Sequence, residues 1–437
     1  MYKYFIQTFG CQMNEHDSEI MAGMLAEMGM EAAESPEDAS VIIFNTCSVR
    51  ENADKRFFGT LGQVKKKKKA EPETVVCVCG CMMQQQHVID TVKTKYPWVD
   101  IIFGTHNIHM LPKLVRNVMA ERQRQIDVWP DGGEIVEGLP SKRLFECKAL
   151  VNIMYGCNNF CTYCIVPYTR GRERSRKPEN VIDEVRRLAD DGVREVMLLG
   201  QNVNSYRGDD GTDFAGLIRR LQDVEGLERI RFMTSHPKDL SPDLIRAFRE
   251  CGKLCKNIHL PVQSGSSRVL RMMNRRYDRD HYMDLVRQLR DSVPEITISS
   301  DIMVGFPGET EEDFQDTLDL IEKVRYDSAF TFLYSPRKGT PAAEKEDQIP
   351  EEIKHDRFNR MVDLINQISA EKNAAMEGRT EMVLVEGPSK QKKDTLAGRT
   401  DGFKLVNFPG DISLTGKMVP VRITKGKTFS LEGELVL

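Results

Sequence analysis

Two kinds of hydrophobic pattern alternate along the first 120 residues. Short runs of β-branched and aromatic residues predict buried strands, and the segments between them have helical periodicity. The predicted strands cover residues 3–9, 41–45, 74–79 and 100–103, and the predicted helices cover residues 17–28, 50–64, 84–95 and 107–119. Because strands that alternate with helices usually pair in parallel, we expect an N-terminal parallel α/β domain.

A second alternation of strands and helices follows residues 127–143, which lack periodicity and are rich in glycine and proline, as a linker is. Its predicted strands lie near residues 149–155, 195–199, 229–234, 256–260, 296–304 and 328–334. Its predicted helices lie near residues 179–191, 214–223, 241–250, 280–291 and 311–324. Six such repeats favour an open or partial parallel barrel in the centre of the chain.

The last part of the chain changes character again. A charged helix is predicted over residues 351–376, and four short strands broken by glycines follow it at residues 381–385, 403–407, 418–424 and 429–436. This pattern is typical of a small all-β barrel. A length of 437 residues agrees with three domains at about 150 residues each. The expected boundaries are 1–126, a linker at 127–142, then 143–373 and 376–437.

The composition places the chain among ordinary globular proteins. It has 40% hydrophobic and 29% charged residues and a mean hydropathy of −0.43. No apolar run is long enough for a membrane span, and the first residues turn polar too early for a signal peptide, so we expect a cytoplasmic protein without membrane contact. The net charge of −4 gives no overall sign of nucleic-acid binding, although the residues after 376 are mildly basic.

Cysteine spacing carries the strongest chemical signal. Cys157, Cys161 and Cys164 form a C-x-x-x-C-x-x-C run directly after the first predicted barrel strand. Three thiolates can hold an iron–sulfur cluster and leave one iron open for a substrate or cofactor. The alternative is a structural zinc site, which needs a fourth ligand from elsewhere in the chain.

A second set of cysteines appears when they are compared with the predicted strands. Cys11, Cys47 and Cys81 each follow the carboxyl end of a strand in the N-terminal domain. In a parallel sheet these ends lie at one edge, so the three thiols can converge on a second open cluster. The alternative is that each is an ordinary small buried residue. We assign core or structural roles to the other five cysteines, which are Cys77, Cys79, Cys147, Cys251 and Cys255.

Polar residues follow the predicted barrel strands, where enzymes with such barrels keep their sites. They are Gln201, Asn202, Ser235, Gln263 and Asp301. Two loops are rich in arginine and could form a basic rim that contacts phosphates of a folded RNA, or could pair with nearby carboxylates. These basic residues are Arg170, Arg172, Arg174, Arg176 and Lys177 in one loop, and Arg268, Arg271, Arg275, Arg276 and Arg279 in the other. The lysine run 65–69 is interpreted as a solvated helix end, with a phosphate-binding patch as the alternative.

Several motifs together resemble a known family, the methylthiotransferases of the radical S-adenosylmethionine superfamily. They are Thr8-Phe9-Gly10-Cys11-Gln12-Met13-Asn14, Gly156 to Pro167, Leu199 to Asn204, Thr234 to Pro237, Leu260 to Ser266, Leu384 to Gly387 and Gly398 to Thr400. The resemblance covers nearly the whole chain. The residues after Cys11 look like the branch of the family that modifies isopentenyladenosine in tRNA.

The resemblance implies a central partial (β/α)6 radical S-adenosylmethionine barrel and a C-terminal all-β TRAM barrel. It also implies two [4Fe-4S] clusters, one at Cys157, Cys161 and Cys164 and an auxiliary one at Cys11, Cys47 and Cys81. Two molecules of S-adenosylmethionine would serve each product, one for the methyl group and one for the radical. Tyr163 would contact the cofactor adenine. The resemblance assigns Gln201, Asn202, Ser235, Gln263 and Asp301 to the cofactor or target base, and Arg170, Arg172 and Arg399 to RNA.

The implied reaction is methylthiolation of carbon 2 of N(6)-isopentenyladenosine at position 37 of the tRNA anticodon loop. That carbon carries a non-acidic C–H bond, so a radical is better suited to the reaction than a base or a nucleophile. The implied partners are an electron donor such as flavodoxin or ferredoxin and a sulfur or cluster carrier, and the implied state is a monomer. The alternatives are the same chemistry on threonylcarbamoyladenosine or on a ribosomal-protein aspartate, and a non-catalytic zinc-binding RNA protein.

Overall fold

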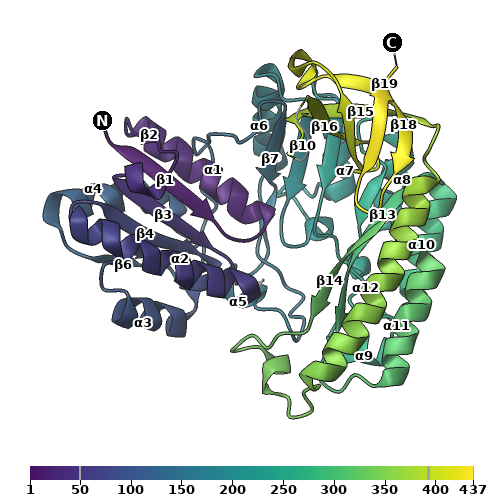
Figure 1. The fold of residues 1–437 in the computed structure, drawn as a ribbon, viewed down its shortest axis with the longest axis horizontal. Helices are drawn as coiled ribbons and strands as arrows, with labels where there is room; N and C mark the ends of the chain where they lie inside the picture. The colour runs from purple at the N-terminus through teal and green to yellow at the C-terminus, as the bar shows by residue number, and fades with distance from the viewer. Residues whose placement is uncertain (49–50, 391–393, 437) are drawn as a thin grey trace. The chain divides into compact units, whose positions relative to one another are not determined.

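The structure is a computed structural model that describes residues 1–48, 51–390 and 394–436. The chain divides into two compact units (Figure 1). Unit 1 contains Met1–Leu144, Met154–Phe160 and Cys164–Arg176, and unit 2 contains Phe145–Ile153, Cys161–Tyr163 and Lys177–Leu437. The first residue of the predicted helix 50–64 and the last residue of the predicted C-terminal domain lie outside the described residues.

Unit 1 is built on a parallel sheet of six strands in the order β2-β1-β3-β4-β5-β6. These strands are β1 (Lys3–Thr8), β2 (Glu31–Ala32), β3 (Val41–Thr46), β4 (Val75–Gly80), β5 (Ile101–Phe103) and β6 (Gln125–Asp127). The helices are α1 (Gln12–Glu27), α2 (Glu51–Ala70), α3 (Gln86–Lys95) and α4 (Leu111–Glu121). Every residue of β3 and β4 is buried, because helices cover both faces of the sheet.

The two faces of this sheet have separate hydrophobic cores. On one face, residues of α2 and α3 such as Phe57 and Val92 pack against Phe44 of β3. On the other face, residues of α1 and α4 such as Leu25 and Val115 pack with the opposite side chains of β3 and β4. The predicted parallel α/β fold of this part of the chain is therefore confirmed.

Two helices of unit 1 differ from the predicted bounds for a physical reason. Helix α1 starts at Gln12, five residues before the predicted position, and its first turns bury the polar side chains of Asn14 and Asp17. These buried polar residues interrupt the apolar pattern on which the prediction relied. Helix α2 continues through the lysine run 65–69 to Ala70, because lysine has a high helix propensity although it has no apolar periodicity.

Unit 2 contains six parallel strands that form two sheets, in the orders β11-β10-β7 and β12-β13-β14. They are β7 (Lys148–Asn152), β10 (Glu195–Leu199), β11 (Arg229–Phe232), β12 (Asn257–His259), β13 (Thr297–Val304) and β14 (Ser328–Leu333). A parallel bridge between Ile230 and Leu254 joins β11 to the segment that leads into β12. The strands therefore follow one another in chain order, and the predicted partial barrel of six strands is confirmed.

Helices follow the barrel strands in the predicted alternation. They are α6 (Pro178–Asp190), α7 (Phe214–Leu221), α8 (Pro242–Glu250), α9 (Ser267–Met272), α10 (Arg279–Ser292) and α11 (Glu311–Val324). The short helix α9 was not predicted, because six residues are too few to show a helical period. The cysteine loop carries β8 (Met154–Tyr155), α5 (Val166–Thr169) and β9 (Arg174–Ser175), all of which belong to unit 1.

The C-terminal part of unit 2 is the long helix α12 (Glu351–Ala374) and a closed barrel of five strands. The strands are β15 (Thr380–Pro388), β16 (Thr395–Thr400), β17 (Leu405–Pro409), β18 (Met418–Gly426) and β19 (Leu431–Leu435). The all-β barrel was predicted, but β16 was missed because its sequence TLAGRT carries little apolar pattern. Within the described ranges, no helix is long and apolar enough to cross a membrane.

Candidate active site

Three of the predicted cluster cysteines follow three neighbouring strands of the unit 1 sheet. Cys11 lies at the N-terminus of α1 after β1, Cys47 directly follows β3, and Cys81 directly follows β4. Strands β1, β3 and β4 are adjacent and parallel, so their carboxyl ends lie at one edge of the sheet. The topology therefore places the three cysteines at the edge where ligands bind in such sheets.

Glycines let the backbone approach closely at this edge. Gly10, next to Cys11, has a φ of 128°, and a Cβ atom built there would lie 2.8 Å from the Sγ of Cys47. Gly80, next to Cys81, has a φ of 92°, and a Cβ atom there would collide with the backbone of Thr46. Both conformations and both close approaches exclude a side chain, so these two positions require glycine.

A buried arginine contacts one of these three thiols. The Nε of Arg170 donates a hydrogen bond to the Sγ of Cys81 over 3.3 Å, and its Nη2 forms an ion pair of 2.7 Å with Asp17. Only 4% of Arg170 is exposed, and its expected contact with RNA stays a prediction. The guanidinium faces the cysteine edge because Asp17 on α1 holds it there.

The pKa values of the thiols at this edge differ. The pKa of Cys11 is lowered to about 6, chiefly because Cys47 forms a hydrogen bond with its thiolate and because Arg170 lies nearby. Asn14 on the same helix also contacts the Cys11 sulfur, over 3.4 Å. Burial raises the pKa of Cys81, and the charge of Arg170 opposes that rise. The edge therefore favours a thiolate at Cys11, and a thiolate is the form that binds iron.

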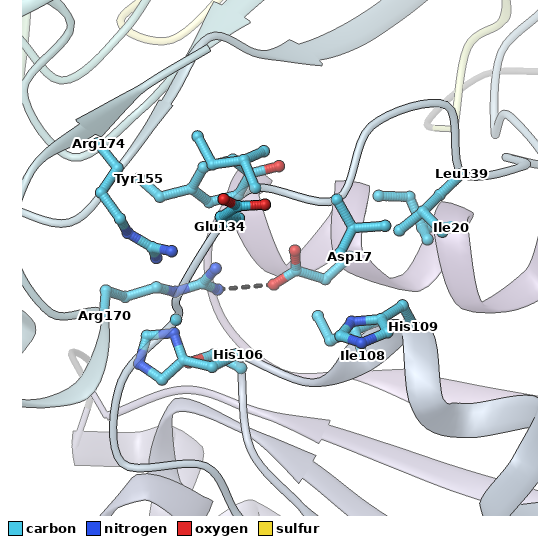
Figure 2. A pocket seen from close by; sticks show the side chains of 14 residues that line it. Asp17, Ile20, His106, Ile108, His109, Glu134, Leu139, Tyr155, Arg170 and Arg174 are labelled. Atoms are coloured by element: carbon cyan, nitrogen blue, oxygen red, sulfur yellow. Dashed lines mark hydrogen bonds and ion pairs between the residues drawn. The ribbon is translucent and has the colours of Figure 1, made fainter.

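A pocket opens beside the ion pair of Arg170 and Asp17 (Figure 2). Arg174 and His106 also line it, and Figure 2 shows their side chains on the same side as the Arg170 guanidinium. Burial, together with the charges of Arg174 and Arg170, lowers the pKa of His106 to about 4. His106 is therefore uncharged at neutral pH.

The cysteines of the C-x-x-x-C-x-x-C run lie in the loop after β7. Cys161 is buried, and Cys157 and Cys164 are half-buried. A second buried arginine, Arg275, donates a hydrogen bond from Nη1 to the Sγ of Cys161 over 3.4 Å. The same Nη1 lies 3.5 Å from the hydroxyl of Tyr163, the aromatic residue inside the run.

Polar atoms without a partner gather after two adjacent barrel strands. After β10, Asn202 donates to Asp239 over 2.7 Å, but its buried Oδ1 has no hydrogen-bond partner among the described residues, and neither amide atom of Asn204 has one there. After β11, Ser235 Oγ and His236 Nε2 are likewise buried, and the part of the chain that the structure describes offers them no partner. Buried polar groups normally form hydrogen bonds. These strand ends therefore fit a polar ligand that would complete their hydrogen bonds.

The other predicted residues of the barrel site lie at neighbouring positions. Gln201 is half-buried directly after β10. Gln263 follows β12 in a left-handed conformation with a φ of 72°, and its backbone pairs with Asp301 and Met303 of β13. The Asp301 carboxylate lies 3.4 Å from the Nε2 of His259. The adjacent strands β12 and β13 therefore bring Gln263 and Asp301 together.

Four of the nine arginines in the two predicted basic loops pair with carboxylates, as the alternative interpretation stated for the loops; one of them is Arg170 with Asp17. The other pairs are Arg176 with Glu137, Arg268 with Asp313, and Arg279 with Asp316 and Asp319. Arg172, Arg271 and Arg276 are exposed, and the described part of the chain offers them no ion pair. Arg399 of the C-terminal barrel lies over the Phe403 ring at 4.4 Å and near Glu386.

The lysine run 65–69 is only partly solvated. Lys68 forms an ion pair of 2.8 Å with Asp100, and Lys67 pairs with Glu71 over 2.7 Å. Lys65 lies over the ring of Trp98 at 5.1 Å. Among the described residues, the two cysteine sets included, no three side chains of His, Cys, Asp or Glu are grouped closely enough to hold a single metal ion. The two cysteine sets therefore stay predictions as cluster ligands.

Three family models match the chain in the order of its structural parts. Residues 3–104 match the uncharacterized protein family UPF0004, residues 151–321 match the radical SAM superfamily, and residues 374–436 match the TRAM domain. The cysteine run and most of the six-stranded barrel lie in the second match. The closed five-stranded barrel lies in the third.

Curated relatives match over nearly the whole chain. The tRNA-2-methylthio-N(6)-dimethylallyladenosine synthase of Clostridium perfringens is 57% identical over 435 residues, which cover 99% of this chain and 97% of the relative. The chain belongs to the tRNA-2-methylthio-N(6)-dimethylallyladenosine synthase family. Synthases of the same name from Clostridioides difficile and Alkaliphilus oremlandii are 55% and 54% identical, over 99% of this chain and 91% and 93% of theirs.

Solved structures share the fold of this synthase family at low sequence identity. The radical S-adenosylmethionine methyltransferase TsrM from Kitasatospora setae, solved with cobalamin and a [4Fe-4S] cluster, is 13% identical with a TM-score of 0.56. The match covers 78% of this chain and 77% of TsrM. The chain is therefore a radical S-adenosylmethionine enzyme by family and by fold.

The sequence prediction missed the residues that surround the cysteines. Asn14 and Asp17 lie three and six residues after Cys11, a spacing that places them near Cys11 at the start of one helix. Their polarity inside an otherwise buried helix was a signal. Arg275 was predicted as part of a basic rim, and nothing in its local sequence distinguishes it from the exposed Arg276 beside it.

Proposed function

We propose that this chain methylthiolates carbon 2 of N(6)-isopentenyladenosine at position 37 of tRNA. One observation carries the proposal: relatives that are 53–57% identical over 99% of the chain are named tRNA-2-methylthio-N(6)-dimethylallyladenosine synthases. The name of these relatives supports isopentenyladenosine over threonylcarbamoyladenosine or a protein side chain as the acceptor. The radical SAM and TRAM matches support radical chemistry on an RNA.

Two iron–sulfur clusters are part of the proposal. The donor sets fit, because each set offers three thiols on a loop or sheet edge with a buried arginine beside one of them. Cys157, Cys161 and Cys164 would hold the cluster that binds S-adenosylmethionine, and Cys11, Cys47 and Cys81 would hold the auxiliary cluster. Reductive cleavage of S-adenosylmethionine would supply a radical able to break an unactivated C–H bond.

The protein residues bind and orient the reactants. Asn202, Ser235, Gln263 and Asp301 lie after or within barrel strands, where their polar atoms can hold S-adenosylmethionine or the target base. Tyr163 packs against the small core of Val269, Met273, Phe306, Tyr334 and Ala342, which fixes its ring beside the cysteine run. Arg172 and Arg399 are proposed to contact tRNA phosphates, which are recognised by positive charge.

We also propose reaction partners, an oligomeric state and a domain organisation for this chain. One electron from a small donor such as flavodoxin or ferredoxin, and sulfur from a sulfur or cluster carrier, would be needed for turnover. We propose a monomer in the cytoplasm, with domains at 1–126, 143–373 and 376–437 and a linker at 127–142. Two molecules of S-adenosylmethionine would be used for each product.

The acceptor is tested with a panel of substrates. The reconstituted enzyme is incubated without oxygen with reductant, S-adenosylmethionine and one acceptor at a time. The acceptors are isopentenylated tRNA, tRNA with threonylcarbamoyladenosine, unmodified tRNA and a ribosomal-protein peptide containing aspartate. Mass spectrometry of the digests should find a methylthio group only with isopentenylated tRNA. A methylthio product from another acceptor, and none from isopentenylated tRNA, would contradict the proposal.

A further inference from the structure

Each cysteine set has one buried arginine that donates to a sulfur atom. Arg170 lies 3.3 Å from Cys81 in unit 1, and Arg275 lies 3.4 Å from Cys161 in unit 2. The exposed fractions of the two arginines are 4% and 5%. A guanidinium is always charged, and a buried charge needs an anion or a full set of hydrogen bonds. The neighbours of each arginine must therefore supply such an anion or such a set of hydrogen bonds.

Arg275 is fixed by neutral groups. Its Nη2 donates to the carbonyl of Pro261 over 2.9 Å, and its Nε contacts the Tyr277 hydroxyl over 2.8 Å. Among the residues that the structure describes, no carboxylate lies within ion-pair distance of Arg275. Burial raises the pKa of Tyr277 to about 12, so its hydroxyl is neutral, and the thiol of Cys161 is the accepting group that can become an anion as a cluster ligand. The position thus suits an arginine that balances a negatively charged cysteine ligand set.

Arg170 is fixed by a carboxylate instead. Its two ends point at different partners, since Nη2 binds Asp17 and Nε binds Cys81. Asn14 accepts a further contact from Nη2 and also touches Cys11. The nitrogens of the Arg170 guanidinium therefore contact both the Asp17 carboxylate and the cysteine edge. Lysine, a point charge with no fork, cannot hold both contacts at once.

We infer that Arg170 and Arg275 are positioning residues for the two clusters, each holding one cysteine set through an N–H···S hydrogen bond. The inference rests on the proposed function, because it assumes that both sets bind iron. Hydrogen bonds to cluster sulfurs and nearby positive charge make a cluster easier to reduce. Arg170 thus raises the reduction potential of the auxiliary cluster, and Arg275 raises that of the cluster in the barrel.

The test measures each cluster alone in the full-length chain. The triple variant Cys157→Ala, Cys161→Ala, Cys164→Ala keeps only the auxiliary cluster, and the triple variant Cys11→Ala, Cys47→Ala, Cys81→Ala keeps only the other. Arg170→Gln and Arg275→Gln are placed in both backgrounds, with Arg170→Lys and Arg275→Lys as conservative partners. Iron content and the midpoint potential from redox titrations followed by electron paramagnetic resonance are the measurements.

The expected pattern is reciprocal. Arg170→Gln should shift the potential of the auxiliary cluster to more negative values, or release its iron, and leave the other cluster unchanged; Arg275→Gln should do the opposite. The lysine variants should give smaller shifts of the same sign, and they decide the question if a glutamine variant does not fold. Unchanged potentials, or equal shifts of both clusters, would overturn the inference. Iron-free protein in both backgrounds with the arginines intact would contradict the proposed function itself.

Discussion

Close contacts at the cysteine edge of unit 1 are possible only because Gly10 has no side chain. A Cβ atom at Gly10 would meet the Cys47 side chain, and its φ of 128° is strained for any other residue. The backbone conformation and the close contact with Cys47 therefore both exclude a side chain at Gly10.

Gly10→Ala is predicted to lower the iron bound at the auxiliary site and to reduce the methylthio product at least tenfold, because it pushes Cys47 away from Cys11. Gly59→Ala is the matched control, since nothing lies within 4 Å of that position on α2. The control should keep full iron content and product. Equal iron in both variants, measured per folded chain, would contradict the role given to Gly10.

Cys11→Ala is predicted to abolish the methylthio nucleoside while 5′-deoxyadenosine formation persists, because the variant keeps the cysteine run of the barrel. Cys77→Ala, which changes a fully buried core residue of β4, is the control and should keep both products. Both are quantified by mass spectrometry of the reaction mixture. Methylthio product from Cys11→Ala would disprove its role as a ligand.

At the scale of single elements, the start of α11 shows how one helix is fixed beside the barrel. Thr310 and Asp313 form a capping box, in which each side chain accepts from the backbone of the other residue. Asp313 also accepts from Ser266 over 2.6 Å and pairs with Arg268, both of which belong to the α9 segment. The capping box therefore fixes the start of α11 and also joins α11 to the α9 segment.

Asp313→Asn is predicted to lower the thermal midpoint of unfolding at pH 7, with a loss of stability of about 1 kcal/mol, because the amide lacks the charge that strengthens the bonds to Arg268 and Ser266. Burial opposes the charge of Asp313, but its partners Arg268, Ser266 and Thr310 keep its pKa below the ordinary value of 3.8. A lowered pKa stabilises the fold above the unfolded pKa, and this contribution is lost as the pH falls. The difference between wild type and variant should therefore be complete at pH 7 and shrink below about pH 4. A constant difference from pH 7 to pH 3 would contradict this account.

Most elements were predictable from the sequence because their apolar periods are regular. The six barrel strands and the helices α6, α7, α8, α10 and α11 were all predicted within a few residues. The prediction failed where polar residues are buried, as at the start of α1, and where the segment was too short, as in α9. The glycine-containing strand β16 was missed for lack of an apolar pattern.

At the scale of the whole molecule, buried arginines of the central barrel donate hydrogen bonds to backbone carbonyls of the C-terminal barrel, within unit 2. Arg231 of β11 is 2% exposed and contacts Glu195 of β10 over 2.8 Å. Its other two nitrogens donate to the carbonyls of Thr400 and Asp401 over 2.7 Å. The C-terminal barrel therefore contributes to the stability of unit 2 through contacts that do not involve RNA.

Removal of residues 376–437 is predicted to lower the thermal midpoint of the remaining chain by several degrees, because Arg231 and its neighbour Arg229 lose carbonyl partners and would be left without full hydrogen bonding. Arg172→Gln is the contrasting variant, since this exposed residue is proposed to contact RNA and its side chain stacks only on the Phe160 ring among the described residues. It should weaken tRNA binding and leave the thermal midpoint unchanged. A truncated chain as stable as the full chain would contradict the structural role of the barrel.

The site was predicted less completely than the fold, and the reason is that its parts come from distant segments. The six cysteines could be named as candidates because strand ends and short spacing single them out in the sequence, and their role as ligands stays a prediction. The contacts of Arg170 and Arg275 with two of these cysteines could not be predicted, since they depend on tertiary partners such as Asp17, which lies 153 residues from Arg170.

The proposed reaction is tested most directly in one reaction mixture. The full-length enzyme, with iron and sulfide reconstituted, is supplied with reductant, S-adenosylmethionine and isopentenylated tRNA, and the nucleosides and free 5′-deoxyadenosine are measured together. We expect both 2-methylthio-isopentenyladenosine and 5′-deoxyadenosine to appear, and neither to form without reductant. Protein that holds both clusters and yields neither product would contradict the proposed function.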